Sequence, residues 1–329
     1  QNRIVVCAQI NQDTYRFTGI ARLLPTGAPD TDFGNQGKVI LTIDDDRIIP
    51  YDITIDYEDR IAVACNVESF YTNYKRFGIF MLNPGGSLNK KFNNTGYKIL
   101  GVSSASEATA IAVQNDGKVV VAGTAANDPR GSFVVVRFFP DGNLDTEFGD
   151  SGYVFKYFNG LTDVPYAMQL TSNNSIVVAG YLTKVLQPGD TGADIVIAKL
   201  TPDGEPDPHF GTDGSVIYDN ALRQENILSM QVQHNQQLLI GGYMYGSQKY
   251  RPVMMRLRNG SPYVSLLPFI GNGILAAATS VPLRWKHRDI NYFSILLSTD
   301  GGESWNPVPG ADSLHTADSV FYWEVPYLS

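Results

Sequence analysis

Residues 116–123, DGKVVVAG, recur along the chain with a similar order of residue types. Related stretches are NNSIVVAG at 173–180 and NQQLLIGG at 235–242, with weaker copies EDRIAVAC at 58–65 and NRIVVCA at 2–8. Repeats of about 20–50 residues or somewhat longer mark propellers, solenoids and arrays. The chain is therefore expected to consist largely of one duplicated structural unit.

A second motif follows the first about 20 residues later, as in FFPDGNLDTEFGDSGYV at 138–154. In each of its four copies a proline and a phenylalanine lie eight residues apart, and successive phenylalanines are 59, 56 and 62 residues apart. The pairs are Pro25 and Phe33, Pro84 and Phe92, Pro140 and Phe148, and Pro202 and Phe210. A fixed core between loops of variable length supports the duplication.

The copy at 115–172 predicts four strands, at 118–123, 132–139, 153–158 and 165–172. The first two are continuous apolar runs rich in β-branched residues, which is typical of strands covered on both faces. Pro-Asp-Gly at 140–142 is a turn signal, because Pro fixes φ and Gly supplies a positive φ. Four antiparallel strands match one propeller blade, and such a sheet is stable only when neighbouring sheets cover both of its faces.

These two motifs together resemble the delta-60 repeat, which occurs in bacterial secreted and surface proteins of mostly unassigned activity. The resemblance covers about residues 1–260 in five copies, and it implies a fold but no catalytic residues. The copy at 57–114 departs from the pattern, with Asn93 in place of Gly and Asn89 in place of Asp. The expected fold is all-β, with a β-propeller of about five four-stranded repeat units over residues 1–264.

A second domain is expected over residues 265–329, where the three tryptophans lie. Its strand-like runs resemble a small immunoglobulin-like or fibronectin-like β-sandwich module. STDGGESW at 298–305 matches the Asp-box of sialidases, but it occurs once and outside the repeats. We interpret it as a hairpin turn, because the arginine cluster and the other residues that sialidases need are not recognisable.

Two columns of the repeat carry charge. Asp30, Asn89, Asp145 and Asp207 precede the phenylalanine by three residues, where a side chain can accept hydrogen bonds from nearby backbone N–H groups. One such residue per repeat provides too few oxygens for Ca²⁺. The basic column comprises Arg22, Arg137 and Lys199, and also Arg256 if one residue is deleted in the fifth repeat, with Met81 in the second repeat. It could form a cationic channel, but we favour bonds to turn carbonyls or to the acidic column.

The composition excludes some functions. The net charge is −8 and the basic residues are scattered, which disfavours nucleic acid as a partner. No apolar run is long enough to cross a bilayer. Cys7 and Cys65 are offset by one residue in the repeat alignment, so they are expected on opposite sides of their strands and not in a disulfide. No cofactor or metal site is indicated.

Three functions remain open. The first is a non-enzymatic binding or scaffold protein, placed outside a bacterial cell after removal of a signal peptide, that contacts protein or glycan through loops at 124–132, 181–193 and 243–251. The second is a self-assembling subunit, because the chain begins at the second strand of a blade and leaves an edge unpaired. The third is a glycan-processing hydrolase, which needs a pair of carboxylates. The candidate ligand-binding residues are Tyr243, Tyr245, Lys249, Tyr250 and Arg251.

Overall fold

In the computed structural model, the regular elements of the described residues are all β-strands. The structure describes residues 3–12, 15–72, 74–126, 132–187, 190–218, 224–233, 237–246, 249–257, 263–266, 279–288, 292–297, 304, 306–315, 318 and 320–325. The chain divides into two compact units, residues 1–259 and 260–329. No helix able to span a membrane occurs in the part of the chain that the structure describes.

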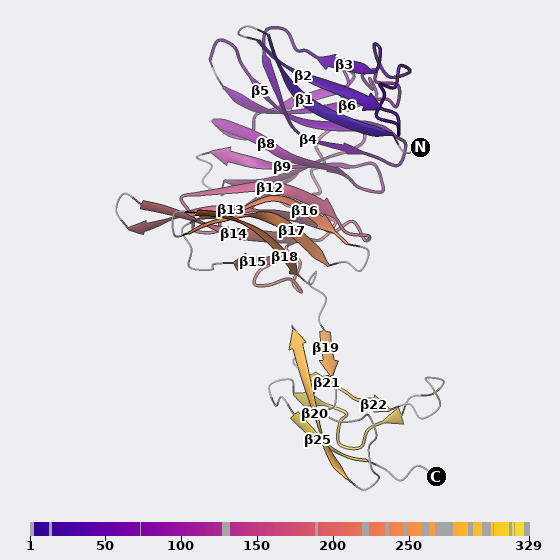
Figure 1. The fold of residues 1–329 in the computed structure, drawn as a ribbon, viewed down its shortest axis with the longest axis vertical. Helices are drawn as coiled ribbons and strands as arrows, with labels where there is room; N and C mark the ends of the chain where they lie inside the picture. Colours follow the sequence, from indigo (N-terminus) through magenta and orange to yellow (C-terminus); the bar gives the residue numbers. More distant parts are fainter. Residues whose placement is uncertain are drawn as a thin grey trace. The chain divides into compact units, whose positions relative to one another are not determined.

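The described strands of the first unit form five antiparallel groups, which we call sheets 1–5 and which are coloured from indigo to orange along the sequence in Figure 1; the last two groups are joined into one seven-stranded sheet. Sheet 1 comprises β1 (Ile4–Gln12), β2 (Tyr15–Leu23) and β3 (Lys38–Leu41). Sheet 2 comprises β4 (Arg47–Ile55), β5 (Ile61–Glu68), β6 (Lys75–Leu82) and β7 (Tyr97–Leu100). Sheet 3 comprises β8 (Ala105–Val113), β9 (Val119–Ala126), β10 (Phe133–Phe138) and β11 (Tyr153–Lys156).

Sheets 4 and 5 continue the same order. Sheet 4 comprises β12 (Thr162–Leu170), β13 (Ile176–Gln187), β14 (Asp190–Leu200) and β15 (Ser215–Tyr218). Sheet 5 comprises β16 (Gln224–Val232), β17 (Leu238–Gly246) and β18 (Lys249–Leu257). One parallel bridge, between Ala193 and Gln224, connects the two sheets.

The prediction that the apolar strands are covered on both faces is confirmed. In β5, Ile61, Val63 and Cys65 face the core shared with sheet 1, and the alternate residues Ala62 and Ala64 face the core shared with sheet 3. All five are buried. Four such cores lie between the five sheets, in chain order. The fold is therefore a series of sheets that bury one another's apolar faces, as in a β-propeller.

The grouping of strands into sheets that was predicted from the sequence is wrong. The strand expected to end the blade at 115–172 is β12, and it pairs with β13 at the start of the next sheet. A tight turn causes this pairing, because Asn174 adopts a positive φ of 63° and Thr171 and Ser175 close the turn between β12 and β13. Each complete sheet therefore begins with the strand that precedes the DGKVVVAG-type motif. Sheet 1 lacks this strand among the described residues.

Cys7 and Cys65 are both free and lie in the core between sheets 1 and 2. As expected, the two side chains lie on opposite faces of their strands. Because sheet 1 stacks on sheet 2, these two faces contact each other, and both cysteines lie in the same core. The Sγ atom of Cys65 lies 3.8 Å from the hydroxyl of Thr18. Burial raises the pKa of both thiols.

The second unit has a small core of its own around Leu283, Ile295, Val308 and Ala311. Its strands form three short sheets. The first comprises β19 (Tyr263–Leu266), β20 (Ser280–Arg288) and β25 (Val320–Glu324). The others pair β21 (Tyr292–Phe293) with β24 (Leu314–His315) and β22 (Leu296–Leu297) with β23 (Asn306–Pro307). The Asp-box residues, apart from Ser304, lie outside the described residues.

Candidate ligand-binding site

The acidic column of the repeat has the turn role predicted for it. In all four copies the side-chain oxygen accepts a hydrogen bond from the backbone N–H two residues on, at distances of 2.9–3.3 Å. The acceptors are Asp30, Asn89, Asp145 and Asp207. The phenylalanine three residues later is buried in each copy. This column therefore stabilises the turn that brings the phenylalanine into the core.

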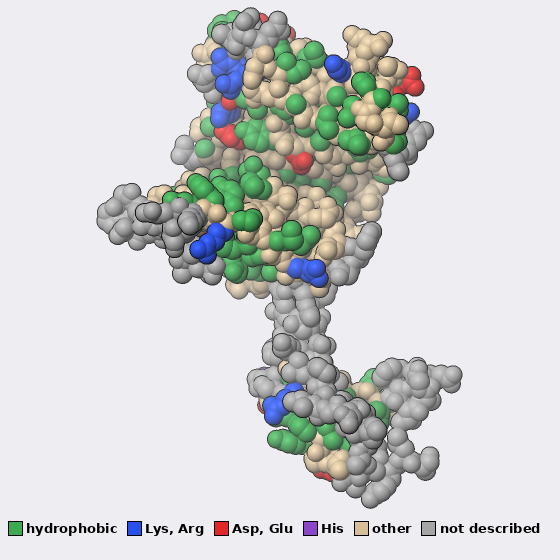
Figure 2. Space-filling view, in the orientation of Figure 1, with side chains coloured by type: hydrophobic (Ala, Val, Ile, Leu, Met, Phe, Trp, Pro, Cys, Tyr) green, Lys and Arg blue, Asp and Glu red, His purple; other side chains and the backbone are tan. Residues whose placement is uncertain are grey.

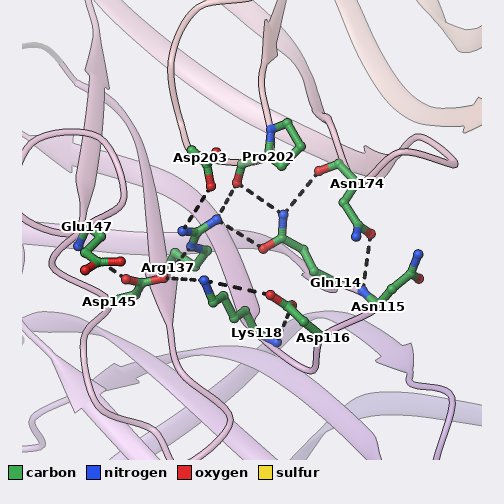
Figure 3. Close-up of polar contacts among 10 residues, drawn as sticks. All are labelled: Gln114, Asn115, Asp116, Lys118, Arg137, Asp145, Glu147, Asn174, Pro202 and Asp203. Atoms are coloured by element: carbon green, nitrogen blue, oxygen red, sulfur yellow. Dashed lines mark hydrogen bonds and ion pairs between the residues drawn. The ribbon is translucent and has the colours of Figure 1, made fainter.

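The basic column also has a structural role in three repeats. Arg22, Arg137 and Lys199 each pair with the acidic residue eight positions on, at 2.7, 2.8 and 2.8 Å. Arg137 also donates a hydrogen bond to the carbonyl oxygen of Pro202 in the next sheet (Figure 3), and Arg22 does the same to Pro84. These arginines connect consecutive sheets, so the structure brings them to turns and not to a cationic channel.

A different column distinguishes the repeats from one another. The first strands of sheets 2–5 each contain a β-bulge, at Tyr51, Thr109, Tyr166 and Leu228. In three sheets the residue before the bulge pairs with a glycine, namely Gly123, Gly180 or Gly242. A Cβ atom there would lie 2.0–2.2 Å from a backbone oxygen of the bulged strand. The last glycine of the motif therefore admits the bulge, which redirects one side chain.

The bulges bring four strands to a single recess. It has a volume of about 250 Å³ and receives residues from β4, β8, β12 and β16. Tyr51, Tyr166 and Leu228 are 44–53% exposed although they lie within sheets. The lining residues are Tyr51, Asp52, Thr109, Tyr166, Ala167, Met168, Gln169, Leu228, Ser229 and Met230. The recess combines hydroxyl groups, one amide and one carboxylate with apolar surface, which is typical of small-ligand sites.

The carboxylate in this recess is tied to the backbone. Asp52 accepts hydrogen bonds from the N–H groups of Ile53 at 2.8 Å and Ile111 at 2.9 Å. The second bond crosses from sheet 2 to sheet 3. Burial raises the pKa of Asp52, and the two N–H donors oppose that rise. Asp52 therefore connects the two strands that form one side of the recess.

Beside the recess, Glu107 is paired with Lys75 at 2.5 Å. Burial raises the pKa of the Tyr51 hydroxyl, and the negative charge of Glu107 adds to the rise. Tyr51 therefore stays a neutral hydroxyl that can donate and accept hydrogen bonds. Figure 2 shows the Lys and Arg side chains of the described residues at several separate places on the visible face.

The five ligand-binding residues predicted from the sequence lie in strands and not in a loop. Tyr243 and Tyr245 belong to β17, and Lys249, Tyr250 and Arg251 belong to β18. The Tyr250 ring contacts those of Tyr243 and Tyr245, with centroids 5.4 and 4.7 Å apart. The expected loop at 181–193 is likewise mostly strand, because β13 and β14 extend across it. Residues 124–126 of the third expected loop belong to β9, and 127–131 lie outside the described residues.

Other features of the described residues do not form a better site. A larger recess of about 590 Å³ lies at the outer strands β11 and β15, but its Lys156 and Asp213 pair with each other at 2.7 Å. No cluster of three or more His, Cys, Asp or Glu residues suited to a metal ion occurs among the described residues. The recess at the bulges is thus the best candidate for ligand binding.

Comparison with known proteins agrees with the fold. The model of a domain of unknown function (DUF5122), described as a β-propeller, matches residues 114–148 and 171–210. No curated protein matches the chain. With the sheet topology, this match defines the class: the chain is an all-β protein whose repeats form a β-propeller fold.

The solved structures that match the chain do so at low identity and low TM-score. The α-L-arabinanase of Cellvibrio cellulosa with arabinohexaose has 13% identity over 77% of this chain and 90% of its own, with a TM-score of 0.36. The polysaccharide lyase Uly1 has 8% identity over 89% of this chain and 68% of its own, with a TM-score of 0.39. The β-propeller domain of the Trilobed protease from Pyrococcus furiosus has 10% identity over 98% and 90%, with a TM-score of 0.35.

Proposed function

We propose that the protein is a non-enzymatic binding and scaffold protein that holds a neutral glycan in the recess at the β-bulges. The observation that supports this most is the contrast between columns. The turn columns repeat the same chemistry in most sheets, whereas the bulge column varies as Tyr51, Thr109, Tyr166 and Leu228. A structural role favours the same residue type at equivalent positions of every repeat, whereas ligand recognition favours different residues at those positions.

The chemistry of the recess favours a ligand rich in hydroxyl groups. Tyr51 and Tyr166 each combine a flat apolar ring with a hydroxyl, and Thr109, Gln169 and Ser229 add neutral polar groups. A sugar ring presents both C–H faces and hydroxyl groups, so it suits this lining. The net charge of −8 and the carboxylate of Asp52 both oppose an anionic ligand.

The carboxylates support binding more than hydrolysis. A glycosidase needs one carboxyl group that gives a proton and a second that acts as base or nucleophile. Asp52 is occupied by two backbone N–H groups, and Glu107 is occupied by Lys75. Both residues therefore have structural partners that a catalytic pair would have to give up.

The location outside the cell is part of this proposal and rests on the resemblance to repeats of secreted bacterial proteins. The immunoglobulin-like or fibronectin-like character of residues 265–329 is likewise proposed. Immunodetection on intact cells of the source organism, with and without added protease, would test the location. Protection from protease in intact cells would contradict it.

The binding proposal is tested by titrating the protein with a panel of neutral and acidic glycans and following heat or tyrosine fluorescence. We expect saturable binding of a neutral glycan that Tyr166→Ala weakens by at least about tenfold, a loss of about 1.4 kcal/mol. Tyr57→Ala serves as the matched control, because Tyr57 is exposed in a turn away from the recess. Equal loss in both variants, or no binding to any glycan, would contradict the proposal.

The hydrolase alternative is decided by the same panel in chromogenic form. We expect no turnover. Hydrolysis that Asp52→Asn or Glu107→Gln abolishes would replace the binding proposal with an enzymatic one.

A further inference from the structure

Sheet 1 has one face that no other described sheet of the first unit covers. Ile4, Val6 and Ala8 point to the side opposite Val5 and Cys7, which pack on sheet 2. Ile4 is 50% and Val6 43% exposed. A recess of about 280 Å³ lies on this surface, which we call the head face. It is lined by Val6, Ala8, Ile10, Gly19, Ile20, Ala21, Lys38, Val39 and Ile40.

The positions of Ile4 and Val6 are buried in every other sheet. Their counterparts in the repeat are Ile61 and Val63, Val119 and Val121, Ile176 and Val178, and Leu238 and Ile240. All eight are at most 1% exposed, because each pair packs against the preceding sheet. The head face therefore has the composition of a surface that another sheet covers.

Sheet 5 has the complementary open face. Gly241 pairs with Met254 in β17 and β18, as Ala122 pairs with Val135 in sheet 3. Val135 is buried against the next sheet, whereas Met254 is 75% exposed. Tyr243, Tyr245 and Tyr250 lie on this same side. We call the surface formed by Tyr243, Tyr245, Tyr250, Met254 and Arg256 the tail face.

The arginine of the tail face occupies a position that connects sheets elsewhere. Arg256 pairs with Leu239, in the register in which Arg22 pairs with Val5 and Arg137 pairs with Val120. Arg22 and Arg137 donate hydrogen bonds to the carbonyl oxygens of Pro84 and Pro202 in the following sheet. Arg256 is exposed, and the matching proline on the head side is Pro25.

We infer that the tail face of one copy of this chain docks on the head face of a second copy. At each of the four interfaces between sheets 1–5, the face that corresponds to the tail face in one sheet packs on the face that corresponds to the head face in the next sheet. The proposed contact between two copies would pair the same two kinds of face. Among the described residues of the first unit, the strand pairs that pack closely between sheets all join consecutive sheets. The contact is heterologous, and it leaves one head and one tail face free in each dimer.

This contact gives a role to residues that the ligand recess does not use. Met254 of one copy would enter the apolar recess on the head face of the other, and Arg256 would reach the carbonyl of Pro25. A head face on a head face would oppose two surfaces of the same kind, a pairing that occurs at none of the four internal interfaces. The inference does not depend on the proposed glycan site.

The experiment is sedimentation velocity on the full chain over a range of micromolar concentrations, with Val6→Asp, Met254→Asp and the control Leu161→Asp. All three positions are exposed, so folding should survive, and circular dichroism checks this. We expect the average mass of the wild type and of the control to rise with concentration. Each face variant should associate roughly 100-fold more weakly, because the contact would bury an unpaired carboxylate.

Mixing the two face variants separates the geometries. Val6→Asp retains an intact tail face and Met254→Asp an intact head face, so a 1:1 mixture should form a dimer and nothing larger. A monomeric wild type at all concentrations would overturn the inference. So would association that Val6→Asp abolishes and Met254→Asp leaves unchanged, which is the result of head-to-head pairing. Failure of the mixture to form a dimer would also overturn it.

Discussion

The guanidinium of Arg137 donates a hydrogen bond to the carboxylate of Asp145 at 2.8 Å, and both side chains are almost completely buried. In the second repeat the same two positions are Met81 and Asn89. The backbone bonds between them are the same, since Asp145 N–H donates to Arg137 O at 3.0 Å and Asn89 N–H to Met81 O at 2.8 Å. The two positions thus change together, from a charged pair to a neutral one.

This pairing predicts strong coupling between the two positions. Arg137→Met or Asp145→Asn alone should cost about 3 kcal/mol of unfolding free energy or more, because each leaves a buried charge without its main partner. The double variant reproduces the second repeat, so it should cost less than the sum by about 1–3 kcal/mol. Urea unfolding of the four proteins measures this. Strict additivity would show that the pair is not coupled.

The same pair predicts a pH dependence of stability. Burial alone would raise the pKa of Asp145, but the bond to Lys118 and the charge of Arg137 outweigh it and lower the pKa below its usual value. A carboxyl group whose pKa is lowered in the folded state stabilises the protein above its unfolded pKa of about 3.9, and this contribution is lost as pH falls through the folded pKa.

Below about pH 4, the wild type should therefore lose stability more steeply than Asp145→Asn, which has no carboxyl group at this position. Chemical unfolding at a series of pH values from neutral to about 2 would show the two stability curves converging. Parallel curves would mean that Asp145 has no lowered pKa.

A pair of turn glycines tests how consecutive sheets lock together. Gly204 has a φ of +92°, and a Cβ atom there would lie 2.8 Å from the ring of Phe148 in the preceding sheet. Gly27 has a similar φ of +84°, but a Cβ atom there would meet nothing within 4 Å. Both alanine variants should lose about 1–2 kcal/mol from the left-handed backbone.

Gly204→Ala should lose about 1–3 kcal/mol more than Gly27→Ala, because its methyl group overpacks the phenylalanine. Thermal or urea unfolding gives the difference directly. Equal losses would mean that the turn of sheet 4 does not rest on Phe148.

Much of the fold could be predicted from the sequence, because duplication repeats every structural requirement. Runs such as Val119–Val121 have no polar alternation, so they had to be covered on both faces. The start of the unit could not be predicted in the same way. A periodic chain has the same pattern wherever the unit begins, and the turn at Asn174 decides that β12 joins β13.

The candidate site was harder to predict for a physical reason. Repetition reveals scaffold residues, and the bulge residues Tyr51 and Tyr166 belong to the column that does not repeat. One signal was present: the motif ends in a glycine inside a strand, as at Gly123, Gly180 and Gly242, and an isolated glycine in a strand suggests a bulge. Tyr243, Tyr245 and Tyr250 were predicted as ligand-binding residues because they are aromatic, and that role stays a prediction; in the structure they lie on the tail face.

A further prediction concerns the carboxylate of the recess. Asp52→Leu removes the side-chain carboxylate that accepts hydrogen bonds from the N–H groups of Ile53 in β4 and Ile111 in β8, and it leaves the buried N–H of Ile111 without its carboxylate partner. It should cost about 1–3 kcal/mol of stability and also weaken glycan binding, whereas Tyr166→Ala should affect binding alone. Unfolding and titration of both variants give the comparison. A fully stable Asp52→Leu protein would contradict the bridging role.

The central claim is that consecutive repeats stack in chain order and share their cores, and nuclear Overhauser effects test it most directly. In protein labelled at Gly and Phe, the account predicts cross-peaks between the ring protons of Phe33, Phe92 and Phe148 and the α protons of Gly86, Gly142 and Gly204, respectively. Ring currents should also shift those α protons. Absence of all three cross-peaks in a folded protein would contradict the arrangement of the sheets.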